Sequence, residues 1–223
     1  MAALFASGRG LGQEAGSGLN MVPAKGRFTP RRRRTIGGAF FLGLVAAILA
    51  GMGGRDQLIV ASLRDRTAGG VPLAGVALSC GVATVLLAAW AGQMVGAGLS
   101  DSAETMLLAI ALALVALELA WWRTTREPAE PTRSLGALAL VLIASQIGDA
   151  TRLLIFALAA GSAAPAMTGA GGALGSAAGL MAALAVGRGG MNALPLKRLR
   201  RTLAALAFVA ALIIGLTARG LIG

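Results

Sequence analysis

Histidine and tyrosine are absent from this chain of 223 residues, and cysteine occurs once, at Cys80. A single cysteine excludes a disulfide framework and a cysteine-based metal site, and without histidine any proton coupling must use carboxylates or water. Charged residues make up only 13% of the sequence, whereas a soluble domain carries about 25%. Because 57% of the residues are hydrophobic, the sequence predicts an integral membrane protein.

Sequence signatures of common enzyme classes are missing too. The chain has no Gly-x-Ser-x-Gly motif, no convincing nucleotide-binding loop, and no Cys/His set or carboxylate cluster for a membrane metallohydrolase. We therefore expect no enzyme activity and no cofactor. The net charge of +11 lies mostly in short connections between apolar runs, which favours the lipid bilayer over nucleic acid as the partner.

The first 35 residues form a Gly-, Ser- and Arg-rich tail that ends in Arg31–Arg34 and has no apolar periodicity. We expect this tail to be disordered, and Met21 is a second in-frame methionine, so residues 1–20 need not be native. The apolar run that follows is about 26 residues long and lacks a small-residue cleavage site, which indicates a retained membrane span and not a signal peptide.

Six apolar runs are long enough to cross a membrane as helices, which need about 20 residues each. The fold class expected is therefore an all-α integral membrane protein with six transmembrane helices. The predicted spans are 36–63, 71–95, 104–122, 135–160, 163–186 and 203–216.

Two of these runs contain polar residues at places where only apolar side chains are expected. The more conspicuous stretch is Ser145–Arg152, and a second, weaker copy is Gly51–Gln57. A single Asp or Arg at the centre of a membrane helix costs roughly 2.5–3.5 kcal/mol on insertion scales. Such residues are functional-site candidates, because they normally face a bundle interior or an aqueous path.

A shift of 95 residues superposes the two polar stretches and brings Gly53 onto Gly148. Each copy opens a set of three spans, and three is an odd number, so the second set must be inverted relative to the first. The sequence thus predicts a tail at 1–35, a first three-helix repeat at 36–122, a polar linker at 123–134 and a second, inverted repeat at 135–223.

The distribution of Lys and Arg predicts the orientation. The first, third and fifth connections hold all the Lys and Arg of the loops, while Asp101 lies in the second. This bias places the odd-numbered connections, including Lys197–Arg201, in the cytoplasm and both termini outside. The basic tail before the first span favours the opposite orientation. The expected location is the inner membrane of a bacterium.

The two polar stretches resemble the motif Glu-x-Gly-Asp-Lys/Arg-Ser/Thr of the GDT family, which belongs to the lysine-exporter superfamily. These proteins are Ca²⁺/Mn²⁺:H⁺ exchangers with two inverted three-helix halves, and the resemblance covers about residues 38–220. In the second copy Gly148, Asp149 and Thr151 match, while Gln146 stands at the Glu position. In the first copy Gly53 and Arg55 match, and the acids are replaced by Gly51 and Gly54.

The resemblance implies a site for a transported Mn²⁺ or Ca²⁺, hard cations that prefer oxygen ligands. The candidate metal ligands are Gln146, Asp149, Thr151, Asp56 and Gln57. The motif backbone is Gly53 and Gly148, and the charge partners are Arg55 and Arg152. Asp149 and Arg152 are three residues apart, a helical spacing at which they can neutralise each other, and Arg55 has Asp56 or Asp149 within reach.

The function expected is a membrane transporter, a divalent cation:proton antiporter with a reduced site. Two alternatives remain open: a structural or regulatory membrane protein that kept the fold without transport, and an exporter of another small solute. A homo-oligomer is compatible with either. Glu118, near the end of the third span, is expected to be an interfacial carboxylate that reaches water, with a role in proton exit as its functional alternative.

Overall fold

The computed structural model describes residues 36–66, 70–121, 135–146, 148–193 and 195–221, and all regular elements in these ranges are α-helices. The predicted tail and linker lie outside the described residues. The helices are α1 (Ile36–Gly51), α2 (Arg55–Arg66), α3 (Gly70–Gly96), α4 (Asp101–Ala120), α5 (Leu135–Gln146), α6 (Ala150–Ala160), α7 (Pro165–Ala193) and α8 (Leu196–Ala218).

Four of these helices, α3, α4, α7 and α8, are each long and apolar enough to cross a membrane. The remaining four form two bent pairs, α1 with α2 at 65° and α5 with α6 at 60°, and each pair suffices for one further span. The described part of the chain therefore holds four to six candidate spans. Large apolar side chains are exposed on many helices, as expected where lipid is the solvent. Examples are Phe41, Leu87, Trp90, Leu140, Leu206 and Phe208.

Several helix boundaries differ from those predicted. The third predicted span, 104–122, begins earlier, because Ser100 caps α4 by accepting a hydrogen bond from the backbone N–H of Ala103. The last predicted span, 203–216, begins at Leu196, so Lys197–Arg201 lie in the first turns of α8 and not in a loop. The interruption of the first span lies at residues 52–54, and Arg55 already belongs to α2.

Glycines bring the backbones of neighbouring helices into direct contact. A Cβ atom at Gly43 of α1 would collide with the carbonyl of Thr168 in α7, and one at Gly92 of α3 would collide with the carbonyl of Phe156 in α6. Small residues allow this close approach, which replaces the missing hydrophobic driving force between helices in lipid.

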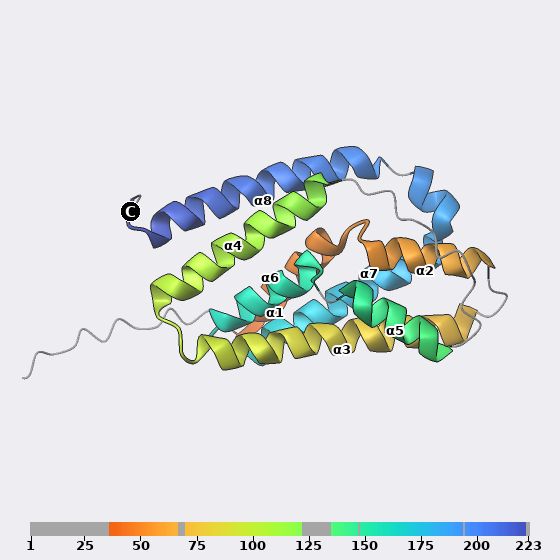
Figure 1. Ribbon diagram of the computed structural model, residues 1–223, viewed down its shortest axis with the longest axis horizontal. Coiled ribbons are helices and arrows are strands. Elements are labelled where there is room, and N and C mark those ends of the chain that lie inside the picture. The colour runs from red at the N-terminus through yellow and green to blue at the C-terminus, as the bar shows by residue number, and fades with distance from the viewer. Residues whose placement is uncertain (1–35, 67–69, 122–134, 147, 194, 222–223) are drawn as a thin grey trace, which may run out of the picture. The chain divides into compact units, whose positions relative to one another are not determined.

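Each bent pair packs on a long helix from the other half of the chain. The pair α1 and α2 packs on α7, and the pair α5 and α6 packs on α3. The helices α3 and α7 also contact each other, and α4 and α8 run side by side (Figure 1). This arrangement brings the two bends together and buries several of their polar residues, namely Asp56, Gln57, Gln146, Thr151 and Arg152.

Candidate functional site

The first bend is a three-residue break between α1 and α2. Gly53 adopts a positive φ of 65°, a conformation that L side chains rarely adopt, and the N–H of Gly54 donates to the carbonyl of Gly51 at 2.9 Å. The side chain of Gln57 accepts a hydrogen bond from the N–H of Gly53 at 3.0 Å, so this predicted ligand stabilises the break itself. Asp56 and Gln57 are both buried in the first turn of α2.

The second bend has the same local form. The helix α5 ends at Gln146, Gly148 has a φ of 90°, and α6 begins at Ala150. Asp149 occupies the N-cap position of α6, but its carboxylate makes no capping hydrogen bond. The side chain is thereby left to interact with other groups.

The shift of 95 residues aligns the two breaks residue by residue. It carries the last residue of α1 onto the last of α5, Gly53 onto Gly148, and the first residue of α2 onto the first of α6. It also carries the contact between Gln57 and Gly179 onto the contact between Arg152 and Thr84.

The guanidinium group of Arg152 lies between the two carboxylates. It donates to Oδ2 of Asp149 at 2.5 Å and to Oδ2 of Asp56 at 3.3 Å, and these side chains are at most 13% exposed. Arg152, and not Arg55, therefore forms the ion pairs with both acids within the described residues.

Two polar residues complete this group. The amide of Gln146 lies 2.8 Å from Oγ1 of Thr84, and Nε of Arg152 donates to the same hydroxyl at 3.4 Å. Because arginine can only donate, the amide is oriented with its oxygen toward Nη2 of Arg152, 3.2 Å away, and its nitrogen toward Thr84. We call Asp56, Thr84, Gln146, Asp149 and Arg152 the ion-pair cluster.

Three of the predicted metal ligands, Asp56, Gln146 and Asp149, thus meet at one place, and a guanidinium group lies among them. Gln57 faces the first break instead. Thr151 is buried beside Gly51, and its hydroxyl has no hydrogen-bond partner in the part of the chain described. Within those same residues no group of three or more His, Cys, Asp or Glu side chains is arranged to hold a metal ion.

Residues from α4 and α8 stabilise the two breaks. Oε2 of Glu118 accepts from the N–H of Ala150 at 2.7 Å, so this carboxylate caps α6 in place of Asp149. Nη1 of Arg200 donates to the carbonyls of Met52 and Gly53 at 3.0 and 2.7 Å, beyond the C-terminal end of α1. Each charge has the sign that the helix dipole favours at that end. Glu118, which the sequence predicts to be an interfacial carboxylate, is half-buried and bonds to the first residue of α6.

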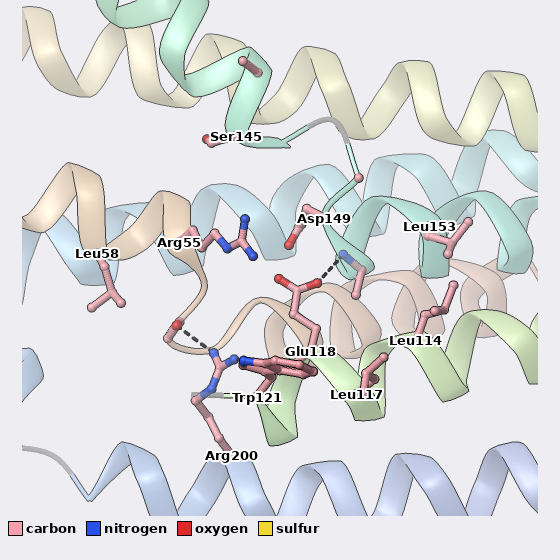
Figure 2. A pocket seen from close by; sticks show the side chains of 14 residues that line it. Arg55, Leu58, Leu114, Leu117, Glu118, Trp121, Ser145, Asp149, Leu153 and Arg200 are labelled. Atoms are coloured by element: carbon pink, nitrogen blue, oxygen red, sulfur yellow. Dashed lines mark hydrogen bonds between the residues drawn. The ribbon is translucent and has the colours of Figure 1, made fainter. Parts of the chain in front are cut away.

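A pocket of about 370 Å³ lies beside the ion-pair cluster (Figure 2). Arg55, Glu118, Asp149 and Arg200 line it together with Ser145 and several apolar residues. In Figure 2 the side chains of Arg55, Asp149 and Glu118 point toward one another across this space. Arg55 is exposed in the pocket, whereas Asp149 belongs to both the pocket and the cluster.

Sequence reasoning did not identify Thr84 and Arg200 as parts of the site. The signal for Thr84 is its hydroxyl within an otherwise apolar run, which the 95-residue shift pairs with Gly179. Arg200 belongs to a basic turn that also serves as an orientation signal, so its role depends on knowing that α8 begins before it.

The fold and the site define a helical, multi-pass membrane protein with two broken helices and a buried cluster of ionised residues where the breaks meet. Comparison with protein-family models, with curated proteins and with solved structures finds no match to this chain.

Proposed function

We propose that the chain is a membrane transporter that exchanges a cation for protons at the two helix breaks. The observation that carries this proposal is the position of Arg152, whose guanidinium group bridges Asp56 from one broken span and Asp149 from the other. A positively charged group held between two buried carboxylates occupies the place that a transported cation would take. Intramembrane ionised residues with such partners are typical of transport pathways.

The matching breaks support the inverted-repeat architecture that belongs to this proposal. The 95-residue shift aligns helix ends, positive-φ glycines and the packing of each bent pair on the other long helix. Broken helices from two inverted repeats, meeting inside the bundle, are a common arrangement of transporter substrate sites.

The transport cycle follows from competition for the carboxylates of Asp56 and Asp149. Three kinds of positive charge can neutralise them in turn: the guanidinium group of Arg152, a transported cation, or protons. If Arg152 withdraws, two carboxylates and the amide oxygen of Gln146 suit a divalent cation such as Mn²⁺ or Ca²⁺. If Arg152 stays, the three ionised groups carry one net negative charge, which suits a monovalent cation.

One specific observation favours a second candidate, a membrane protein that kept the fold without transport. Arg152 already binds both carboxylates, so each acid of the ion-pair cluster has a positively charged partner within the protein itself.

Uptake into proteoliposomes with an imposed pH gradient separates the two candidates. We expect uptake of Mn²⁺ or Ca²⁺ above that of empty liposomes, and we expect Asp149→Asn to abolish it because one of the two carboxylates is lost. Asp101→Asn, an exposed acid at the start of α4, is the matched control and should retain uptake. Parallel assays with Na⁺ and K⁺ report whether Arg152 stays in place. No uptake of any of these cations would favour the non-transporting candidate.

A further inference from the structure

The 370 Å³ pocket reaches the ion-pair cluster at one residue, Asp149. The carboxylate of Asp149 contacts Arg152 on its buried side, while Asp149 also lines the pocket beside Ser145 and Gly148. A solute that fills the pocket therefore meets a member of the cluster without crossing any further layer of side chains.

The pocket lies at the level of the two helix breaks, where α4 ends and α8 begins, and α2 and α5 extend beyond this level (Figure 1). Leu117, Glu118 and Trp121, at the C-terminal end of α4, form one of its walls, and Arg200 contributes from the second turn of α8. Nη2 of Arg200 donates to the carbonyl of Glu118 at 2.9 Å, which holds these two helix ends together. This end of α8 carries the exposed residues Lys197, Arg198 and Arg201, and the positive-inside rule predicts that it faces the cytoplasm.

On the other side of the ion-pair cluster, α3 and α6 pack in backbone contact. Cβ atoms at Gly92 and Gly96 of α3 would collide with the carbonyls of Phe156 and Ala160 in α6. Thr168 is buried at the start of α7, and its hydroxyl lies 3.1 Å from that of Ser162. Contact of this kind leaves no room for a solute between α3 and α6 on that side of the cluster.

The four charged side chains that line the pocket differ in how they are bonded and exposed. Glu118 binds the N–H of Ala150, Asp149 binds Arg152, and Arg200 binds backbone carbonyls. Arg55 is exposed in the pocket, and its charge acts on Glu118 across the space shown in Figure 2. Arg55 is therefore placed to set the electrostatic potential that an approaching ion meets.

We propose that this pocket is the aqueous vestibule through which the transported ion reaches Asp149 from the membrane face where α4 ends and α8 begins. The opposite face is closed in this conformation, and Arg55 sets the charge selectivity of the vestibule. The inference rests on the proposed function only in that a transported ion uses the vestibule. The access of water-soluble reagents to the pocket is tested without any transport measurement.

Cysteine labelling tests the vestibule directly. Cys80, which is buried, is replaced by alanine, and Ser145→Cys or Ala144→Cys then places a single thiol on the pocket wall. Arg198→Cys and Asp101→Cys, at exposed positions, mark the two membrane faces. A membrane-impermeant methanethiosulfonate reagent is applied to right-side-out and to inside-out vesicles.

The vestibule predicts that the pocket thiol reacts only from the face that labels Arg198→Cys. Reaction from the face of Asp101→Cys, alone or in addition, overturns the proposed closure. Failure of both pocket thiols to react while Arg198→Cys does react overturns the vestibule. Labelling as predicted in a protein that transports nothing would leave the vestibule standing and count only against the proposed function.

The role of Arg55 has a separate readout. The rate of modification of Ser145→Cys is measured with a cationic and an anionic reagent in about 0.15 M salt, where charges more than about 8 Å away are largely screened. Arg55→Gln should raise the ratio of cationic to anionic rates at least about threefold, because a unit positive charge that lines the same pocket as the thiol is removed. Arg198→Gln is the matched control and should leave the ratio unchanged. An unchanged ratio in Arg55→Gln overturns the role assigned to Arg55.

Discussion

Arg152 holds together side chains from two distant parts of the sequence. Its guanidinium group binds Asp149, three residues before it, and Asp56, which is 96 residues away. All three ionised side chains are almost fully buried, so each is stable only because the others are present. The net contribution of such a group to stability is modest, but removing one member leaves a charge without its partner.

Arg152→Ala should therefore destabilise the protein by about 3–5 kcal/mol, because two buried carboxylates lose their partner. The measurement is unfolding in detergent micelles, with the exposed Arg198→Ala as the control. The triple variant Asp56→Asn/Asp149→Asn/Arg152→Gln removes all three charges and should recover most of the lost stability. If Arg152→Ala unfolds like the control, the ion pairs do not contribute as described.

At the scale of the residue, sequence reasoning found the charged members of the cluster but not their arrangement. Asp56, Asp149 and Arg152 are conspicuous because ionised side chains are expensive inside an apolar run. The spacing of Asp149 and Arg152 indicates a local pair, whereas the approach of Asp56 depends on how α2 packs against the rest of the bundle. The capping of α6 by Glu118 could not be predicted from the sequence, because it requires that α4 lie beside the second break.

At the scale of the element, glycines decide which helices can touch. The contact of α3 with α6 depends on Gly92 and Gly96, where a side chain would meet a backbone carbonyl that cannot move aside. Another glycine of α3, Gly75, has no other atoms within 4 Å of the position where a Cβ would lie. The same residue type in one helix thus has a packing role at one position and none at another.

Gly92→Ala should lower the free energy of unfolding by about 1–3 kcal/mol, because the added methyl group forces α3 away from α6. Gly75→Ala is the matched control in the same helix. It should be neutral or stabilise by up to about 1 kcal/mol, because alanine favours a helix more than glycine does. Thermal unfolding of the two variants side by side checks this, and equal behaviour would mean that the close approach is not required.

The interruptions of the two bent spans were also predictable in outline. Polar residues and glycines within apolar runs indicate breaks at both places. The first break lies at residues 52–54, just before the charged and amide residues Arg55–Gln57 of the polar stretch. The reason is that Gln57 can bond back to the N–H of Gly53, so the polar residues begin a new helix just after the break and do not form the break itself.

At the scale of the whole molecule, the two sets of helices are interlocked. The bent pair of each set packs on the long helix of the other set, and α4 packs along α8. Few contacts of this kind would form if each set folded as a separate unit. The interior of the protein, including the ion-pair cluster, is therefore made jointly by both.

This interlocking predicts that two fragments, divided within residues 122–134 and expressed together, assemble and co-purify in detergent. The reason is that each fragment buries its bent pair mainly against the other. Co-purification through a tag on one fragment is the measurement, and Gly92→Leu, which disrupts the contact of α3 with α6, should reduce the yield of the pair. Gly75→Leu should not. Fragments that purify separately would contradict the joint interior.

The sequence by itself determined that the chain is helical, that its apolar runs are long enough to cross a membrane and that polar residues interrupt two of them. These properties depend on composition and on local order along the chain, which apolar runs and glycines record directly. Only the tertiary structure decided that Arg152 lies between Asp56 and Asp149, that Glu118 caps α6 and that Arg200 binds the end of α1. Those contacts join residues far apart in sequence, and they exist because close helix packing brings two breaks and two helix ends to one place.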